Sequence, residues 1–438
     1  AMTYTLGIDL GTSYFKAGLF DAEGTLCGLG RVEVRKRLDD GIRCELAVED
    51  FWRYLQQAIE QAKMQAKAAT NDIVAVGYSS QANTFVLLDE NDTPLTPLIV
   101  WTDRRGQVVY PQIRKLWQQD DFLQSTGLGT ACSEGLWINK LLWFQTHQPQ
   151  LWQKTRKILT ICDYLVYGLT GRRVVDTGTT SLTGILDIQK AAWNAEALAA
   201  LQIEAVMLST PMLSGTPAGT ITQKTLAAQL GVPMGIPMVL GSLDHYMAAM
   251  GAGLGTMAQA TTSLGTVVAC VNQTPNFAPQ KGVCVARATG GRGYHQLAWD
   301  MNGAVVLEWY NRTFCPNMTI AELVDAAASV PADCAGLIAK PCANQYEGLQ
   351  GFENIRKTHT HGHFARAIMQ SVADTLARLI TQLCPDRRPQ RIAATGGGAK
   401  SRLWLEVCSH TINAEVFAAD CPEPACKGAD LINYYFAD

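Results

Sequence analysis

The sequence predicts an α/β fold made of two similar halves around a cleft, and three observations support this prediction. The first thirty residues alternate as strands do and turn at a glycine. A helical apolar period over residues 49–69 is then followed by the buried strand 73–78. Residues 260–270 repeat the opening pattern, because a Gly-Thr turn again separates two apolar strands. This repeat indicates a duplicated fold.

The other elements follow from periodicity and from turn-forming residues. In helix 49–69 the apolar positions Phe51, Leu55, Ile59 and Ala62 lie on one face. Prolines and glycines mark residues 211–241 as loops and short elements. We expect one domain boundary near Gly241. The further elements and the two domains are expected at these ranges: helices 135–145, 193–201 and 364–384, strand 391–394, and domains 1–240 and 241–438.

Composition predicts a globular enzyme with a large core. Apolar residues make up 47% of the 438 residues and charged residues 17%. The net charge of −3 provides no basic footprint, so we expect no nucleic-acid partner. The uncharged stretch 246–280 is interrupted by glycines and polar residues, so we expect no membrane partner either.

Cysteine spacing and the N-terminal residues predict the compartment. The thirteen cysteines are scattered without a CxxC pair, which is typical of free thiols in a reducing cytosol. The N-terminal residues lack the basic segment and apolar run of a signal peptide. We therefore expect a cytoplasmic protein.

Asp9 ends the first strand and precedes the turn Leu10-Gly11-Thr12-Ser13. A carboxylate at a strand end can hold Mg²⁺, while backbone N–H groups of such a turn can face a phosphate. Gly11 lets the backbone approach a ligand closely, and the Thr12 hydroxyl adds a donor. The alternative is an ordinary hairpin with a surface aspartate.

Asp244 is a lone carboxylate after the apolar run 239–243 and before a helix of small residues. It is either the N-cap of that helix or a functional acid, because burial of a carboxylate costs free energy that a structural or functional role must offset. The sequence leaves both interpretations open.

Gly396, Gly397 and Gly398 follow a predicted strand and leave flat backbone against which an adenine or a ribose can lie. The alternative is a tight turn between a strand and a helix. Residues 396–401 are not a P-loop, because Ala399 stands where the glycine before the lysine is required.

Two further groups of polar residues have two readings each. His359, His361 and His363 alternate, as metal ligands on a strand would, or they are solvated loop histidines. The turn 101–105 is rich in hydrogen-bonding groups, so it is either an ion-paired loop or a recognition site for a polyhydroxylated ligand.

Together these motifs resemble the FGGY family of carbohydrate kinases, in particular its xylulokinases and ribulokinases. The matches follow the family's order along most of the chain. They are GIDLGTS at 7–13 with Lys16, SQ at 80–81 with VLLD at 86–89, WxDxR at 101–105, KLLWF at 140–144, GxxD at 241–244, SLGT at 263–266, HFARAIMQ at 363–370 and TGGG at 395–398.

The resemblance implies an ATP-dependent sugar kinase with two actin-like (ribonuclease-H-like) domains and a possible homodimer. It implies that Asp9 lies by Mg²⁺ and that Asp244 is the catalytic base. The positions implied to bind ATP are Asp9, Gly11, Thr12, Ser13, Lys16, Gly265, Thr266, Gly396, Gly397 and Gly398. The positions implied to contact the substrate are Gln81, Ala82, Asn83, Asp103 and Asp244.

The pair Ala82-Asn83 departs from the Arg-Glu pair of glycerol kinases and from the Met-His pair common in xylulokinases. Ala82 offers no guanidinium to a small polyol, whereas the Asn83 amide can donate to and accept from hydroxyls. We therefore expect a five-carbon ketose such as xylulose or ribulose, with a heptulose or another polyol as alternatives. The rival function is a non-catalytic or weakly catalytic sugar- and nucleotide-binding switch on the same fold.

Overall fold

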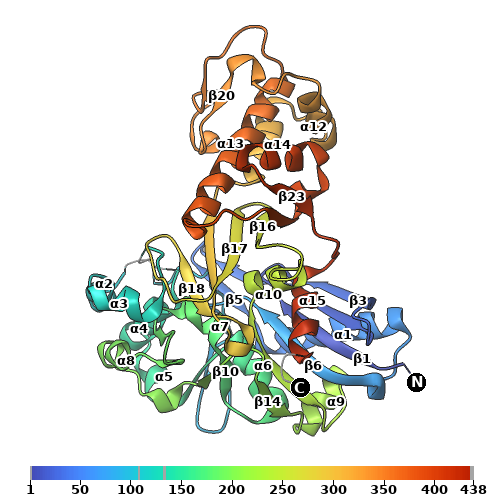
Figure 1. The fold of residues 1–438 in the computed structure, drawn as a ribbon. Helices are drawn as coiled ribbons and strands as arrows, with labels where there is room; N and C mark the ends of the chain where they lie inside the picture. Colours follow the sequence, from blue (N-terminus) through green and yellow to red (C-terminus); the bar gives the residue numbers. More distant parts are fainter. Residues whose placement is uncertain (1, 107–108, 132–134, 435–438) are drawn as a thin grey trace. The chain divides into compact units, whose positions relative to one another are not determined.

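The computed structural model describes residues 2–106, 109–131 and 135–434 (Figure 1). Contacts divide the chain into two compact units. Unit 1 comprises Ala1–Gly251, Thr274–His295 and Glu423–Asp438, and unit 2 comprises Ala252–Gln273 and Gln296–Pro422. Each unit is built from separate segments of the chain rather than from one continuous stretch. A single domain boundary near Gly241 therefore stays a prediction.

The main sheet of unit 1 has the strand order β14-β15-β6-β1-β2-β3. Strand β1 pairs antiparallel with β2 and parallel with β6, and β6 pairs parallel with β15. The opening strands therefore form the expected meander within a mixed sheet. The bounds are β1 Tyr4–Leu10, β2 Tyr14–Phe20, β3 Leu26–Glu33, β6 Ile73–Ser80, β14 Pro217–Thr220 and β15 Pro237–Leu243.

Helix α1 (Val48–Ala66) packs against β3 through the apolar face that its periodicity predicts. Phe51 and Ile59 on this face are fully buried. The two backbones approach closely, because a Cβ at Gly30 would lie 1.8 Å from the carbonyl oxygen of Ala58. Glycine in the strand thus lets the helix lie directly on the sheet.

Helix α15 (Pro424–Leu431) packs against β1 of the same unit, although the two are far apart in sequence. Figure 1 shows α15 in red among the blue strands. The Thr5 hydroxyl donates to the buried carboxylate of Asp430. A Cβ at Gly7 would lie 2.4 Å from the carbonyl oxygen of Cys426, so this packing is also tight.

A second sheet of unit 1 has the order β4-β5-β8-β7-β9, and smaller elements surround both sheets. The remaining strands are β4 Arg37–Asp39, β5 Arg43–Leu46, β7 Phe85–Leu88, β8 Leu98–Ile99, β9 Lys157–Thr160, β10 Val174–Asp176, β11 Leu186–Asp187, β12 Ala192–Trp193, β13 Thr210–Met212 and β18 Cys284–Arg287. The remaining helices are α2 Pro111–Trp117, α3 Asp120–Thr126, α4 Trp137–His147, α5 Pro149–Lys154, α6 Ile161–Thr170, α7 Thr177–Thr180, α8 Ala195–Leu201, α9 Lys224–Leu230 and α10 Asp244–Gly251.

The sheet of unit 2 repeats the pairing pattern of unit 1. Strand β16 pairs antiparallel with β17 and parallel with β22, and β22 pairs parallel with β23. Strand β19 follows β17 in the strand order. The bounds are β16 Ala260–Leu264, β17 Val268–Thr274, β19 Tyr294–Asp300, β20 Ile338–Ala339, β21 Phe352–Glu353, β22 Arg391–Thr395, β23 Glu415–Ala418, α11 Val305–Phe314, α12 Ile320–Ala328, α13 His361–Leu383 and α14 Arg402–Ile412.

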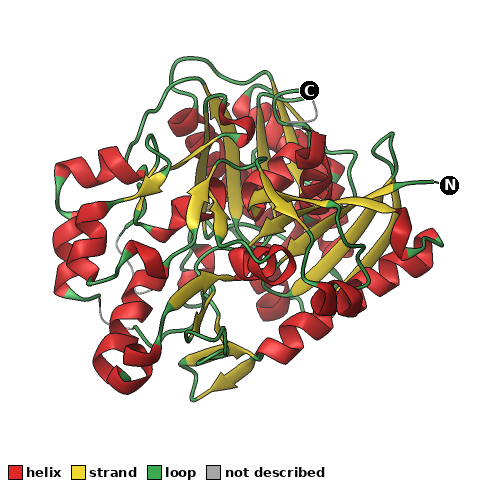
Figure 2. Ribbon diagram, turned by 90° about the horizontal axis from the view of Figure 1, so that it is seen from below, coloured by secondary structure: helices red, strands yellow, loops and turns green. Residues whose placement is uncertain are grey.

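Helix α13 is the long amphipathic helix that the sequence predicts, beginning three residues earlier than expected. Its apolar residues Ile368, Val372 and Leu376 are buried, and it packs against α12 and α14. Figure 2 shows helices in red packed against strands in yellow, which is the expected α/β layering.

Two further expectations concern the environment of the chain. Among the helices of the described residues, none combines the length and apolar character needed to cross a bilayer. Cys44, Cys162 and Cys270 are buried free thiols, in agreement with the scattered cysteine spacing.

Candidate active site

Asp9 lies near the end of β1, within the mixed sheet of unit 1, and is buried. Its Oδ1 accepts a hydrogen bond of 2.9 Å from the Ser79 hydroxyl on β6. Its register partner on β2 is Lys16. The predicted metal-binding carboxylate is therefore held in place by both neighbouring strands.

The pKa of Asp9 is raised to about 7, first by burial and then by the negative charge of Asp244. The Lys16 charge and the Ser79 hydrogen bond oppose this rise only in part. Two carboxylates that repel each other at one end of a sheet form a place where a divalent cation lowers the electrostatic energy. Asp9 and Asp244, far apart in sequence, are thus brought into one electrostatic site.

Lys16 on β2 forms an ion pair of 2.8 Å with Glu423, which immediately precedes α15. Both side chains are largely buried, with 24% and 18% of their surfaces exposed. The amine is therefore held beside Asp9, rather than extended into solvent.

Asp244 follows the last residue of β15 and is the first residue of α10. Its Oδ1 accepts a 2.8 Å hydrogen bond from the backbone N–H of His245. The side chain is half-buried, so it remains accessible to a ligand. Asp244 therefore begins the helix as predicted, and its second carboxylate oxygen, Oδ2, is available to accept a proton.

Gln81 lies directly after β6 and connects to the turn that follows Asp9. Its Nε2 donates to the carbonyl oxygens of Leu10 (3.2 Å) and Gly11 (3.0 Å). Its Oε1 accepts a 2.7 Å bond from the Thr84 hydroxyl. The polar atoms of the buried Gln81 side chain thus have protein partners, and the predicted substrate contact stays a prediction.

Asn83 adopts a left-handed backbone with φ of 64°. Its Nδ2 donates to the Leu182 carbonyl at 3.1 Å, and its Oδ1 accepts from the Trp137 backbone N–H at 3.3 Å. Beside it, Ala82 is buried. The amide keeps one further donor hydrogen and one lone pair for a ligand.

Asp103 is fully buried and is engaged by protein donors on both oxygens. The Cys44 N–H donates to Oδ2 at 2.7 Å, and the Arg105 N–H donates to Oδ1 at 3.0 Å. The Arg105 guanidinium pairs with Asp103 at 2.9 Å and with Glu45 at 2.7 Å. The WxDxR turn is therefore an ion-paired loop, and direct substrate contact by Asp103 stays a prediction.

In unit 2 the hairpin between β16 and β17 carries Gly265 and Thr266 at its tip. Leu264 pairs with Val268, so the turn is short and its N–H groups lie at the end of the sheet. Thr266 is exposed. This hairpin has the features of a phosphate loop, namely a Gly-Thr tip and a hydroxyl.

Gly396 lies directly after β22 with φ of 86°, a conformation that favours glycine. A Cβ there would lie 3.0 Å from the carbonyl carbon of Leu264 and 3.1 Å from the nitrogen of Gly265. The predicted nucleotide residues of unit 2 are therefore in direct proximity to one another.

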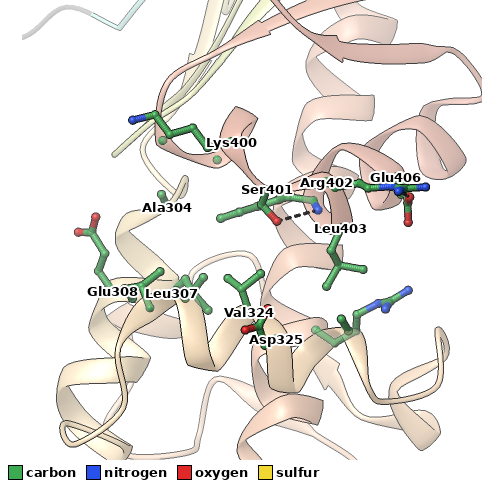
Figure 3. A pocket seen from close by; sticks show the side chains of 17 residues that line it. Ala304, Leu307, Glu308, Val324, Asp325, Lys400, Ser401, Arg402, Leu403 and Glu406 are labelled. Carbon is green, nitrogen blue, oxygen red and sulfur yellow. Dashed lines mark hydrogen bonds and ion pairs between the residues drawn. The ribbon is translucent and has the colours of Figure 1, made fainter.

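Gly397 and Gly398 line a pocket of about 860 Å³ within unit 2. Figure 3 shows side chains that line it, with Leu307 and Glu308 from α11 and Val324 and Asp325 from α12 on one side. On the other side are Lys400, Ser401, Arg402, Leu403 and Glu406. Both polar and apolar groups line the cavity, which suits a nucleoside. A Cβ at Gly397 would meet no atom within 4 Å, so this position opens into space.

His361 and His363 lie in the first turn of α13 and His359 lies just before it, so the three histidines do not alternate along a strand. The Thr360 N–H donates to Nδ1 of His363 at 3.1 Å, which caps the helix. The Arg356 N–H donates to Nδ1 of His359 at 3.0 Å, and His361 Nδ1 lies 2.9 Å from the Tyr310 hydroxyl. Within the described ranges, no group of three His, Cys, Asp or Glu side chains is arranged to bind a metal.

The two helices that complete the pocket, α11 and α12, were not predicted from the sequence. Residues Leu307 and Glu308 on α11 and Asp325 on α12 lie in it, yet they carry no short motif. A sequence signal existed for α12, because Thr319 and Glu322 form the capping box that begins it. In the opposite wall, the Ser401 hydroxyl accepts from the Trp404 N–H at 3.2 Å and caps α14. That serine follows the glycine segment directly and is part of the same wall.

Sequence profiles assign the whole fold to one family. Residues 4–251 match the N-terminal domain of the FGGY family of carbohydrate kinases, and residues 236–435 match its C-terminal domain. The chain therefore belongs to the FGGY family of carbohydrate kinases, as its motifs indicate.

Curated relatives and solved structures agree with this assignment. The chain is 25% identical to a xylulose kinase of Lactococcus lactis subsp. lactis over 98% of its own length and 87% of the relative's. It is 23% identical to a gluconokinase of Bacillus subtilis, over 99% and 87%. The crystal structure of a ligand-bound xylulose kinase from Lactobacillus acidophilus shares its fold with a TM-score of 0.87, at 22% identity and coverage of 98% and 89%.

These findings confirm the two-domain actin-like α/β fold and the class of activity. The protein is a sugar kinase, a phosphotransferase with an alcohol group as acceptor, and kinases of this family use ATP. Family membership favours the enzyme over the non-catalytic switch considered as its rival.

Proposed function

We propose that this kinase transfers the γ-phosphoryl group of ATP to a hydroxyl of a five-carbon ketose such as xylulose or ribulose. The observation that carries the proposal is the carboxylate pair of unit 1. Asp9 and Asp244 stand at strand ends of one sheet, close enough for Asp244 to raise the pKa of Asp9. Phosphoryl transfer to an alcohol needs a proton acceptor and a charge that neutralises the phosphates, and the pair can support both needs.

In this proposal Asp244 accepts the proton of the attacking sugar hydroxyl. A hydroxyl is a weak nucleophile, so removal of its proton as the bond to phosphorus forms lowers the barrier. The His245 N–H holds one carboxylate oxygen at 2.8 Å and so orients the other. Its half-buried position keeps the base accessible to a substrate.

Asp9 is the residue that would hold Mg²⁺. Its carboxylate is the hard oxygen ligand that magnesium prefers, and its pKa is raised by burial and by the negative charge of Asp244 more than Lys16 lowers it. Bound magnesium would neutralise charge on the phosphate oxygens. Ser79 orients Asp9 through its hydrogen bond, whatever ion is present.

The remaining roles concern ATP. We assign a phosphate-binding role to the backbone N–H groups of Gly11 and Thr12, with Ser13 and Lys16 beside them. We assign the same kind of role to the backbone N–H groups of Gly265 and Thr266. The adenosine is assigned to the pocket lined by Gly397 and Gly398. The Lys16 amine beside Asp9 adds positive charge where the phosphates would lie.

The choice of a pentulose rests on the residues after β6. A buried alanine at position 82 provides no charged group for a three-carbon polyol, and Asn83 keeps donor and acceptor capacity for further hydroxyls. A site built for more hydroxyls discriminates by up to roughly 10⁴-fold against a substrate that lacks them. Relatives named xylulose kinase support the same choice.

The test is a substrate panel with purified protein and MgATP, containing glycerol, D- and L-xylulose, D- and L-ribulose, gluconate and a heptulose. ADP release is measured for each, and kcat/KM is compared. We expect one pentulose to exceed glycerol by at least about 100-fold. A kcat/KM for glycerol that equals or exceeds that of every ketose would refute the pentulose assignment, and a best rate with gluconate would replace it.

A further inference from the structure

A continuous set of hydrogen bonds joins the two predicted binding segments of unit 1. It starts at the turn after β1, where Gln81 holds the carbonyl oxygens of Leu10 and Gly11. The Gln81 backbone N–H also donates to the Leu10 carbonyl at 3.1 Å. The segment that follows β6 is therefore fastened to the phosphate loop through both the backbone and the side chain of one residue.

Thr84 carries the connection onward. Its hydroxyl donates to Gln81 Oε1 at 2.7 Å and accepts from the backbone N–H of Trp101 at 3.0 Å. Thr84 is only 1% exposed, so water cannot readily replace either bond. One hydroxyl thus serves as both donor and acceptor between two loops.

Trp101 closes the circuit. Its Nε1–H donates to the Thr12 hydroxyl at 2.8 Å, which returns the connection to the phosphate loop. Its carbonyl oxygen accepts a 2.7 Å bond from the buried Lys140 amine. Trp101 also begins the ion-paired WxDxR turn that contains Asp103.

The circuit therefore runs from Gly11 through Gln81, Thr84 and Trp101 to Thr12. Gln81 lies beside Ala82 and Asn83. A sugar that moved this segment would therefore also move the phosphate loop at Gly11, to which the segment is hydrogen-bonded. If a ligand at one end favours one arrangement of the shared bonds, a ligand at the other end that favours the same arrangement binds more tightly, and such coupling is reciprocal.

We propose that Thr84 and Trp101 are positioning residues that couple occupancy of the sugar site to the conformation of the phosphate loop. The inference rests on the proposed function for the identity of the two sites. Neither residue needs to touch the reacting atoms, because both act through the backbone of the turn and the Thr12 hydroxyl.

The central experiment compares Thr84→Val with Thr84→Ser and wild type. Valine keeps the shape but leaves the Gln81 oxygen and the Trp101 N–H without their partner, whereas serine keeps the hydroxyl. The quantity measured is the coupling ratio, which is the Kd for MgADP without sugar divided by the Kd with the best panel sugar at saturation. We expect both the coupling ratio and kcat to fall about tenfold in the valine variant and to stay at wild-type values in the serine variant.

A matched control separates coupling from general loosening. Thr96 is also buried, and its hydroxyl accepts a 3.2 Å bond from the Leu87 N–H outside the circuit. Thr96→Val removes a hydroxyl near the same sheet, so it should lower the melting temperature comparably and leave the coupling ratio unchanged. An equal loss of coupling in Thr96→Val, or a retained ratio in Thr84→Val, overturns the proposal.

Two further arms keep the test decisive. If Thr84→Val does not fold, Trp101→Phe decides, since its smaller ring lacks the Nε1–H donor to Thr12 while the backbone bonds are kept. An unchanged coupling ratio then overturns the proposal. If no panel sugar is phosphorylated by wild type, the proposed function fails. The Kd for MgADP alone then decides the inference: a rise of roughly threefold to tenfold in Thr84→Val but not in Thr84→Ser supports it, and equal values overturn it.

Discussion

Strand β1 of unit 1 and strand β16 of unit 2 occupy the same place in two sheets of the same pairing pattern. Each pairs antiparallel with the strand after it and parallel with a strand much later in its unit. Aligned by their turns, Leu10-Gly11-Thr12 corresponds to Leu264-Gly265-Thr266, and Asp9 corresponds to Ser263. The two hairpins thus differ in charge, since Asp9 pairs with Lys16 across the first, whereas Ser263 pairs with Ala269 across the second.

The parallel partners extend the comparison. Ser79 on β6 pairs with Asp9, and Thr395 on β22 pairs with Ser263. After these strands, unit 1 continues with Gln81 and Ala82, whereas unit 2 continues with Gly397 and Gly398. One backbone arrangement therefore supports a charged polar site in one unit and an open glycine surface in the other. We infer that unit 1 performs the acid–base and metal chemistry and unit 2 binds the nucleoside.

The largest effect is expected at Asp244. Asp244→Asn keeps the side-chain shape but removes the proton acceptor, so kcat should fall roughly 10²–10⁴-fold. The MgADP affinity and the melting temperature should stay close to wild type. Single-turnover measurements with the best panel sugar test this. Retention of more than about half of wild-type turnover would show that Asp244 is not the base.

The next effect contrasts equivalent positions of the two hairpins. Asp9→Asn should raise the KM for MgATP about 100-fold, because a charged metal ligand is lost. Ser263→Ala, the matched change in unit 2, should raise it less than about tenfold, because a neutral hydrogen bond contributes only ~0.5–1.5 kcal/mol. Steady-state kinetics at several magnesium concentrations decide. An equal rise in the KM for MgATP at the two positions would contradict the assignment of the metal chemistry to unit 1 and of nucleoside binding to unit 2.

The raised pKa of Asp9 gives the same variant a pH signature. Its folded-state pKa of about 7 exceeds the ordinary value of 3.8, so without magnesium this carboxyl makes the folded state less stable as pH rises between those values. Asp9→Asn should therefore melt at a higher temperature than wild type near about pH 8, with the difference disappearing toward about pH 4. A melting difference that is constant with pH would contradict this.

The smallest effect concerns the glycine surface. Gly397→Leu places a side chain in open space at the pocket and should raise the KM for ATP about tenfold without affecting the KM for sugar. Gly398→Leu is a poorer test, because its Cβ would lie 2.9 Å from the Leu264 side chain and would disturb packing. A Gly397→Leu variant with unchanged ATP KM and intact melting would remove the pocket from the nucleotide site.

Much of this organisation was predictable from local sequence. The apolar spacing in residues 49–69 predicted helix α1 and its buried face, and the Gly-Thr turns predicted both hairpins. These features are local, because periodicity and turn chemistry depend on nearby residues. Family motifs then supplied the class of activity.

Other features depend on contacts that no short motif records. The Thr84–Trp101 circuit, the Asp9–Asp244 repulsion and the pocket walls on α11 and α12 all join residues far apart in sequence. The cytoplasmic location and the homodimer stay predictions, since the contacts within one chain report neither.

The position of α15 has a consequence for the order of events during synthesis. Residues 424–431 cover β1, yet they leave the ribosome after all segments of unit 2, which end at Pro422. Unit 2 can therefore complete its core while the first strands to be synthesised still lack the helix that packs on them at Gly7. Until residues 424–431 have been translated, β1 lacks this helix, and an apolar sheet face that is left uncovered during synthesis is prone to aggregate.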